Sequence, residues 1–499
     1  MKDAIIFTQR GNNVKTGFDN NKYLTLQSQH IFERIAQFGD KLYLEFGGKL
    51  FDDYHASRVL PGFAPDSKLQ MLLQLKDHAE IVIAINANHL HEKKMRSDLR
   101  IGYDEEVFRL IEEFTEIGLY VGSVVITQYT GQKEVKKFES KLKKKNISVY
   151  RHYTIEGYPT NTKKIISEKG FGKNDYIQTT RPLVVVTAPG PGSGKMATCL
   201  SQLYHENKHG VKAGYAKFET FPIWNLPLNH PVNIAYEAAT ADLNDVNMID
   251  PFHLSAYNKI TVNYNRDIEI FPVLQHMFEE IYGTSPYKSP TDMGVNMAGL
   301  CISDDEACRY ASNQEIIRRY YAPKTRYYKE LCPEDELQKQ ELLLQQAHCT
   351  TNDRPCVKAA FAKEKETKTY SGAIELDDGT IITGKTSDFM GPCSSIVINA
   401  LKDLAHIDDE EVLIDAEAFG PIQMLKTNFL GSQNPRLHSN ETLIALALSA
   451  RTNKNAKKAL EQLKSLDGTQ AHITSRVSDV DLSIFRSLGI QVTYEEQKG

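Results

Sequence analysis

The clearest structural signal in the first half of this chain is the segment Leu183-Val-Val-Val-Thr-Ala-Pro-Gly-Pro-Gly-Ser-Gly-Lys195. A β-branched apolar run ends in a loop with three glycines and one lysine, and a helical pattern follows at once in Met196–Tyr204. Glycines let backbone N–H groups approach an anion, the helix N-terminus adds the positive end of its dipole, and lysine adds a point charge. The predicted phosphate-binding residues are Gly190, Gly192, Ser193, Gly194 and Lys195.

The loop departs from a regular Walker A sequence at two positions. Pro189 stands where the first glycine is expected, and Met196 replaces the Ser or Thr that would hold Mg²⁺. It also departs from the dinucleotide fingerprint, because its third glycine comes one residue early and a proline lies inside the turn. Phosphate or nucleotide binding is therefore predicted without hydrolysis being implied, and a purely structural strand-to-helix turn is the alternative.

Composition bounds the class of protein. The 499 residues are 25% charged and 41% hydrophobic, with a formal net charge of -5, which is typical of soluble multidomain proteins. A dedicated nucleic-acid binder would usually be basic. No apolar run reaches the length of a membrane span, and Met1–Phe7 lacks a signal-peptide pattern. We expect a cytoplasmic protein with no nucleic-acid or membrane partner.

The seven cysteines are expected to be reduced thiols, since none pair as Cys-x-x-Cys and the chain is expected in the cytoplasm. Packing as small apolar residues is the better interpretation for most of them. No zinc is predicted, and no residue is assigned as a metal ligand.

The first half alternates between strand and helix patterns. Strands are expected at 41–46, 80–85, 121–127, 147–150, 183–187 and 214–219, with helical patterns at 68–75, 105–116 and 134–145. Such alternation predicts βαβ crossovers and a parallel sheet covered on both faces. The expected organisation is an α/β region over 1–270, a helical segment over 271–350 and an α/β domain over 351–499.

The last third returns to strands. The turn Asp377-Asp-Gly379 lies between two β-rich runs and predicts a hairpin. An apolar strand is expected at 412–414, helices near 394–404, 440–449 and 454–466, and a final strand at 490–494.

Three polar residues are catalytic candidates. Glu219 follows the expected strand 214–219, and ligands of doubly wound sheets bind at the carboxyl ends of strands. Asp250 could act as the acidic Mg²⁺ partner of a phosphate loop, and His253 shares its turn. The alternatives are that Glu219 pairs with Lys217, and that the Asn- and Asp-rich segment around Asp250 forms turns for local reasons.

A second glycine–lysine turn, Gly47-Gly48-Lys49, follows the expected strand 41–46. The two glycines would let the backbone approach an anion that Lys49 could reach. An ordinary strand-to-helix turn is the alternative interpretation, because two glycines are a weak signal.

Four segments carry a resemblance to a known family: Lys41–Phe63, Thr187–Glu206, Ala213–His253 and Ser371–Leu401. They resemble an uncharacterised bacterial family known as a domain of unknown function, over essentially the whole chain. The resemblance implies a cytoplasmic multidomain α/β protein whose C-terminal part is a three-layer α/β domain of cytidine-deaminase-like fold. It implies no established reaction.

The zinc chemistry of deaminases does not carry over to this sequence. Zinc deaminases need His-x-Glu or Cys-x-Glu followed by Pro-Cys-x-x-Cys. Cys393 falls near the expected first ligand, but Ser395 stands where the glutamate is needed, and no Pro-Cys-x-x-Cys follows. We expect the fold without the deaminase reaction.

Two functions remain open on these observations. The first is an enzyme of the phosphotransfer type that binds a nucleotide or a small phosphorylated ligand. The second is a non-catalytic nucleotide sensor or scaffold that assembles, as a homo-oligomer, through its C-terminal domain. A nucleotide is the one cofactor that the sequence suggests.

Overall fold

The computed structural model describes residues 16–39, 41–47, 50, 53–96 and 101–496. The described chain divides into two compact units, Thr16–Arg309 and the residues from Tyr310 onward. Each unit has its own core and is described by itself.

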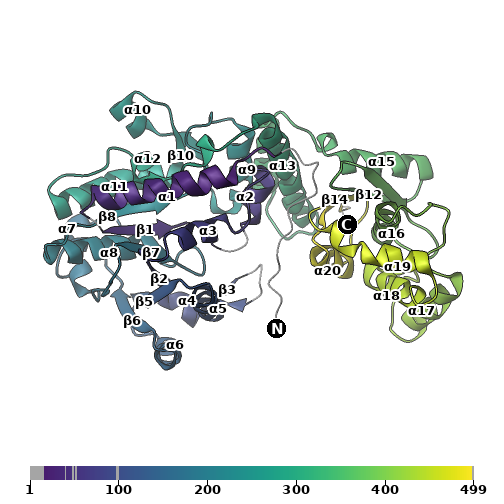
Figure 1. The fold of residues 1–499 in the computed structure, drawn as a ribbon, viewed down its shortest axis with the longest axis horizontal. Helices are drawn as coiled ribbons and strands as arrows, with labels where there is room; N and C mark the ends of the chain where they lie inside the picture. The colour runs from purple at the N-terminus through teal and green to yellow at the C-terminus, as the bar shows by residue number, and fades with distance from the viewer. Residues whose placement is uncertain (1–15, 40, 48–49, 51–52, 97–100, 497–499) are drawn as a thin grey trace. The chain divides into compact units, whose positions relative to one another are not determined.

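The first unit is built on a seven-stranded sheet whose pairings are all parallel (Figure 1). This confirms the parallel sheet predicted from the strand–helix alternation. In spatial order the strands are β11 (Gly294–Val295), β8 (Gly214–Phe218), β1 (Leu42–Phe46), β7 (Leu183–Thr187), β2 (Ala79–Asn86), β5 (Tyr120–Tyr129) and β6 (Ser148–Tyr153).

The strand order contains a switch of direction between β7 and β2. From β2 the chain continues to β5 and β6 on one side, whereas from β7 it crosses to β8 and later β11 on the other side. Right-handed crossovers then place the connecting helices on opposite faces of the sheet. The loops that follow β7 and β2 diverge at this point, which is where open α/β sheets bind their ligands.

Helices cover both faces of this sheet. Those of the first unit are α1 (Asn20–Gln37), α2 (Tyr54–Val59), α3 (Ser67–Gln74), α4 (Ala87–His91), α5 (Tyr103–Glu116), α6 (Lys133–Lys144), α7 (Thr162–Ile165), α8 (Lys195–Lys208), α9 (Pro231–Ala239), α10 (Pro251–Tyr257), α11 (Asn265–Tyr282) and α12 (Pro290–Met293). Two small antiparallel pairs accompany them: β3 (Met95–Arg96) with β4 (Ile101–Gly102), and β9 (Asn247–Ile249) with β10 (Val262–Tyr264).

One core layer of the first unit lies between the sheet and helices α8 and α11. Val184 and Val186 of β7 pack there with Leu200 and Leu203 of α8 and with Phe278 of α11. All five residues of β7 are buried, as expected of a central parallel strand. Burial of one such apolar side chain contributes about 1.5–3 kcal/mol, so the strand that carries the glycine loop is firmly held.

The expected start of a helical segment at residue 271 differs from the structure. Helix α11 begins at Asn265 and buries Phe271, Leu274 and Met277 in the first core, and β11 extends the first sheet. The compact unit accordingly runs to Arg309. Helical periodicity alone does not tell a separate helical segment from a helix that covers a sheet.

The second unit combines helices with a four-stranded sheet. Its helices are α13 (Asp305–Tyr328, which begins in the first unit), α14 (Glu334–Gln346), α15 (Pro355–Thr367), α16 (Pro392–Leu404), α17 (Ala416–Asn428), α18 (Ser439–Ser449), α19 (Lys454–Glu461) and α20 (Asp479–Ser487). In spatial order the strands are β13 (Ile381–Lys385), β12 (Ser371–Glu375), β14 (Gln470–Ile473) and β15 (Gln491–Tyr494).

The predicted hairpin at Asp377–Gly379 is confirmed, because β12 and β13 pair antiparallel around it and Gly379 has a φ of +85°. The predicted strand at 412–414 is wrong. Leu413 and Ile414 are buried in the second core as an irregular segment that leads into α17, so apolar character there reflects burial and not strand pairing.

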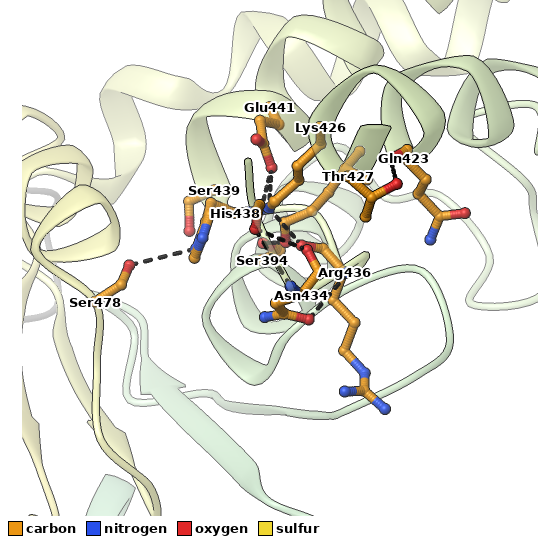
Figure 2. A network of polar contacts seen from close by, with 12 residues as sticks. Ser394, Gln423, Lys426, Thr427, Asn434, Arg436, His438, Ser439, Glu441 and Ser478 are labelled. Atoms are coloured by element: carbon orange, nitrogen blue, oxygen red, sulfur yellow. Dashed lines mark hydrogen bonds and ion pairs between the residues drawn. The ribbon is translucent and has the colours of Figure 1, made fainter. Parts of the chain in front are cut away.

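A network of polar contacts holds the segment between α17 and α18 in place (Figure 2). The buried ammonium of Lys426 donates to the carbonyl oxygen of Arg436 and to Glu441 Oε2, each at 2.7 Å. Glu441 in turn accepts a hydrogen bond from the backbone of His438, at the start of α18. This network connects the last turn of α17 with the start of α18.

Candidate functional site

The glycine loop lies between β7 and α8, as predicted. Gly192 and Gly194 have φ angles of +75° and +87°, where L side chains are strained. Gly194 also lies against β5, since a Cβ atom there would be 2.9 Å from Thr127 Oγ1. At Gly190 a Cβ atom would collide with the Tyr103 hydroxyl. All three glycines are therefore required by the shape of the loop.

Side chains from neighbouring strands hold the carbonyl groups of the loop. Asn86, at the end of β2, donates to the carbonyl oxygen of Gly192 at 3.1 Å. Thr127 of β5 donates to the carbonyl oxygen of Ser193 at 2.8 Å, and the Ser193 hydroxyl donates to that of Gly190 at 2.9 Å. Three carbonyl dipoles of the loop are thus satisfied within the protein.

The backbone N–H groups of the loop are left available. Within the described part of the chain, the N–H groups from Gly192 to Ala197 donate no hydrogen bond, and the first such bond of α8 is that of Thr198 to the Gly194 carbonyl oxygen. A helix normally leaves its first N–H groups unpaired. Here the loop adds two more from Gly192 and Ser193, so that six consecutive N–H groups can bind an anion.

A histidine that sequence reasoning missed borders this loop. His89 of α4 is 9% exposed, and its ring lies about 3.5 Å from the position a Cβ atom would take on Gly192. Burial lowers its pKa, and the nearby Lys94 ammonium lowers it further, so the imidazole is neutral at pH 7. The strand-end position of Asn86–His89, directly after a buried strand, is the signal that could have found it.

The hydrogen bonds of His89 define its tautomer. Lys94 Nζ lies 3.4 Å from His89 Nε2 and 5.3 Å from the centre of the Tyr103 ring. A neutral imidazole that accepts at Nε2 carries its proton on Nδ1. Nδ1 is buried and makes no hydrogen bond to a described residue. It is a buried donor with no partner among the described residues.

The residues after the loop differ in their surroundings. Lys195, half-buried at the first position of α8, forms no ion pair with a described residue. Met196 packs against the core of the first unit. The Thr198 hydroxyl donates to the carbonyl oxygen of Gly194 at 2.9 Å. Neither Met196 nor Thr198 therefore offers a free hydroxyl for Mg²⁺.

Glu219 belongs to a buried charged cluster at the end of β8. Its Oε1 atom lies 2.7 Å from Lys217 Nζ and accepts from the Tyr264 hydroxyl at 3.2 Å. Lys217 also pairs with Asp267. Burial raises the pKa of Glu219 to about 7, against the opposing effect of Lys217 and with the help of Asp267. The pairing with Lys217 that the sequence left as an alternative is present, and it does not preclude a proton-transfer role.

Asp250 serves as the N-cap of α10. Its Oδ1 accepts from the backbone of Phe252 and His253, each at 3.0 Å, and its Oδ2 accepts from the Thr291 hydroxyl at 2.6 Å. The side chain is fully buried. Both oxygens are satisfied, so the geometry favours the local turn interpretation over a metal-binding role.

His253, the other candidate in this segment, lines a cavity. Its Nδ1 lies 2.9 Å from Ser289 Oγ and 3.7 Å from Asp292. The cavity has a volume of about 390 Å³, which is within the range of small-molecule sites, and Glu219 and Trp224 also line it. The structure thus places two of the three catalytic candidates, Glu219 and His253, at one cavity, with Asp250 beside it.

The glycine loop and this cavity occupy the same edge of the sheet. Neighbouring strands lie about 4.8 Å apart, so β8 is roughly 10 Å from β7, with β1 between them. Gly47, at the end of β1, donates its backbone N–H to the Phe218 carbonyl oxygen at 3.3 Å. Gly48 and Lys49, the other residues of the possible second anion loop, lie outside the described residues.

In the second unit, Cys393 is buried at the start of α16, and burial raises its pKa well above the usual range. Among the described residues, no three His, Cys, Asp or Glu side chains are grouped as metal ligands would be. In the same part of the chain, no helix combines the length and apolar character needed to cross a bilayer.

Comparison with known proteins covers both units. The model described as "Domain of unknown function DUF1846, N-terminal" matches residues 16–348, and its C-terminal counterpart matches residues 352–498. A UPF0371 protein of Streptococcus thermophilus is 58% identical over 481 residues, which cover 96% of this chain and 97% of the relative. UPF0371 proteins of Streptococcus sanguinis and Streptococcus uberis are 58% and 57% identical with the same coverage. The chain belongs to the DUF1846, or UPF0371, family of uncharacterised proteins.

Proposed function

We propose that this protein binds a nucleotide or another small phosphorylated ligand at Gly190–Lys195 and is an enzyme of the phosphotransfer type. One observation carries the proposal: six consecutive backbone N–H groups, from Gly192 to Ala197, donate no hydrogen bond to a described residue. The loop carbonyls are held by Asn86, Thr127 and Ser193. Such a row of unpaired donors at a helix N-terminus is suited to a phosphate group.

Charged groups at the loop support the same proposal. Lys195 stands at the first turn of α8 without an ion-pair partner among the described residues, and Lys94 lies next to His89. Neutral His89 adds a donor at Nδ1. Two ammonium groups and one imidazole donor complement the negative charge of a phosphate without any carboxylate described at the loop.

The direct test is calorimetric titration of the full-length protein with ATP, ADP and inorganic phosphate. Lys195→Ala is expected to weaken binding by about 1.5–3 kcal/mol, roughly ten- to 150-fold, because a charge-assisted contact is lost. Lys144→Ala, an exposed lysine of α6, is the control and should bind as the wild type does. Equal affinities of wild type and Lys195→Ala for all three ligands would refute the phosphate-loop proposal.

The alternative is a non-catalytic nucleotide sensor or scaffold that forms homo-oligomers through its C-terminal domain. Two observations favour it: Met196 occupies the Mg²⁺-hydroxyl position, and large apolar residues of the second unit are exposed, with Phe429 at 75% and Leu430 at 70%. Light scattering with and without ATP separates the two functions. A change in mass with no turnover supports the sensor, and turnover at constant mass supports the enzyme.

For the second unit we propose a cytidine-deaminase-like fold without zinc chemistry. The hairpin β12–β13, the following helix α16 and the mixed sheet support the fold. Cys393 has Ser395 instead of glutamate two residues on, which removes the acid–base group of hydrolytic deamination. Metal analysis that finds one zinc per chain would contradict this, as would cytidine deamination. The cytoplasmic location implied by the family resemblance is part of the same proposal.

A further inference from the structure

Basic and aromatic side chains make up six of the fifteen residues that line the cavity at the end of β8. It has a volume of about 390 Å³ and lies among α1, α10, α12 and the loops after β8 and β11. Its basic residues are His30, Arg34, His253 and Lys259, whereas its acidic residues are Glu219 and Asp292. This site is separate from the glycine loop, and ligand binding in it does not require phosphate binding at the loop.

Arg34 is held in place but its charge is not neutralised by a described carboxylate. Its Nη2 donates to the backbone carbonyl of Asp292 and its Nη1 to the side chain of Gln37 at 3.2 Å. Nε is buried and has no hydrogen-bond partner among the described residues. A buried guanidinium N–H without a partner costs free energy unless a ligand accepts from it. Carboxylates and phosphates are the groups that guanidinium binds best.

Both acidic residues of the cavity already have partners. Glu219 is bonded to Lys217 and Tyr264, and Asp292 accepts from the Tyr257 hydroxyl at 2.8 Å. Lys259 is exposed and forms no ion pair with a described residue. The Tyr257 hydroxyl is neutral and leaves the charge of Asp292 in place, so Arg34 and Lys259 together exceed it by one positive charge while Glu219 is protonated or paired with Lys217.

The apolar wall includes the single tryptophan of the chain. Trp224 is half-buried, and its indole N–H donates to the Asn296 carbonyl oxygen at 2.7 Å, which fixes the ring. Asn296 is fixed in turn, because its amide donates to the carbonyl oxygens of Thr220 and Pro222. The ring is thus a preorganised flat surface for a planar or apolar group.

We propose that this cavity binds a small organic anion. The carboxylate or phosphate group of the ligand contacts Arg34, and its uncharged part packs against Trp224. Binding of the anion is coupled to the protonation of Glu219. An anion close to the Glu219 carboxyl binds best when this group carries its proton. Glu219 faces Lys217, Asp267, Tyr264 and Tyr236 inside the protein. On the cavity side the charged or titratable groups are His30, Arg34, His253, Tyr257, Lys259 and Asp292.

The fluorescence of Trp224 reports on the cavity without a label. Benzoate and phenyl phosphate are the charged probes, and benzamide is the neutral probe of the same shape. We expect a saturable change of emission with benzoate or phenyl phosphate, and affinity about tenfold lower for benzamide. The relative affinities of the two charged probes show whether the site prefers carboxylate or phosphate.

Variants connect the signal to the proposed residues. Arg34→Gln should weaken binding of the charged probes about tenfold or more, and Arg34→Lys should weaken it less. Lys259→Gln should also weaken binding of the charged probes, and because Lys259 is exposed this substitution does not disturb the core. Lys195→Ala should give the same response of Trp224 emission to benzoate as the wild type does, which separates this proposal from the phosphate loop. Affinity of the wild type should fall as pH rises through about 7. Glu219→Gln should lose this dependence, and His253→Gln should keep it.

Three results would overturn the proposal: equal binding of benzamide and the charged probes, unchanged affinity in both Arg34→Gln and Lys259→Gln, or absence of any response of Trp224 emission. A pH dependence that disappears in His253→Gln and persists in Glu219→Gln would overturn the coupling to Glu219.

Discussion

Replacement of Glu219 by glutamine is expected to change how the stability of the first unit depends on pH. In the folded protein the pKa of Glu219 is raised from 4.5 to about 7, because burial disfavours its charged form and Asp267 repels it, while Lys217 opposes both effects. Glutamine can accept the same contacts from Lys217 and Tyr264, but it stays uncharged at every pH. The substitution therefore removes one titration and keeps the hydrogen bonds.

The direction and size of the effect follow from proton linkage. A folded pKa above the unfolded one means that the folded state binds the extra proton between about pH 4.5 and pH 7. The stability that Glu219 contributes is fully present below pH 4.5 and is lost as pH rises through 7. Each pKa unit corresponds to about 1.4 kcal/mol, so the loss is about 3 kcal/mol.

Urea denaturation followed by Trp224 fluorescence measures this in the first unit, where the single tryptophan lies. Glu219→Gln should gain about 2.5 kcal/mol relative to wild type between about pH 5 and about pH 8, because the wild type has already lost part of the roughly 3 kcal/mol at pH 5. Glu116 is an exposed glutamate at the end of α5, and the stability of Glu116→Gln should depend on pH as that of the wild type does. A constant difference between Glu219→Gln and wild type across this range would refute the reasoning on the buried cluster.

Three further outcomes are expected. In thermal or urea denaturation, Gly194→Ala should destabilise the first unit by about 1–3 kcal/mol more than Gly210→Ala does. Both glycines have a positive φ, but only Gly194 lies against Thr127, and the space at Gly210 is open. Equal losses of stability in the two variants would contradict the contact with Thr127. Nucleotide binding measured by calorimetry should depend little on Mg²⁺, since a thioether at Met196 is a poor ligand for that ion; strong Mg²⁺-dependent ATP hydrolysis would show that another group holds the metal. Lys426→Met should lower the stability of the second unit by about 2–3 kcal/mol in urea, because it leaves Glu441 without its buried partner; an unchanged midpoint would show that the network of Figure 2 contributes little.

Much of the first unit could be predicted because its signals are local. The apolar run at Leu183–Thr187 is long enough and β-branched enough to define β7, and the glycines define the turn that follows. The boundaries between the units are not set by local sequence signals. Helix α11 and strand β11 pack with the first sheet over long sequence distances, which the helical pattern of Asn265–Tyr282 does not reveal. The missed helix α17 and the wrong strand at 412–414 have the same cause, since burial of Leu413 and Ile414 depends on tertiary packing.

The candidate site shows a similar division. The residue types Gly, Ser and Lys at 190–195 were visible in the sequence, but their neighbours were not. Asn86 and Thr127 come from strands that are about 60 to 110 residues away along the chain, and no motif at the loop requires them. Asp250 is the opposite case. Its acidic side chain suggested chemistry, yet its place before Pro251 made it a helix cap.

The availability of the loop for an anion is therefore a property of the sheet and not of the glycine motif alone. A loop whose carbonyls lacked partners would turn some of them toward the ligand and repel it. Here Asn86 on β2 and Thr127 on β5 bind the carbonyls of Gly192 and Ser193, so the N–H groups face the other way. These two strands lie beyond the switch point from the strand that carries the loop. The same switch that opens the crevice thus supplies the side chains that orient its backbone, which is why a sequence that departs from the Walker A pattern at Pro189 and Met196 can still form an anion-binding loop.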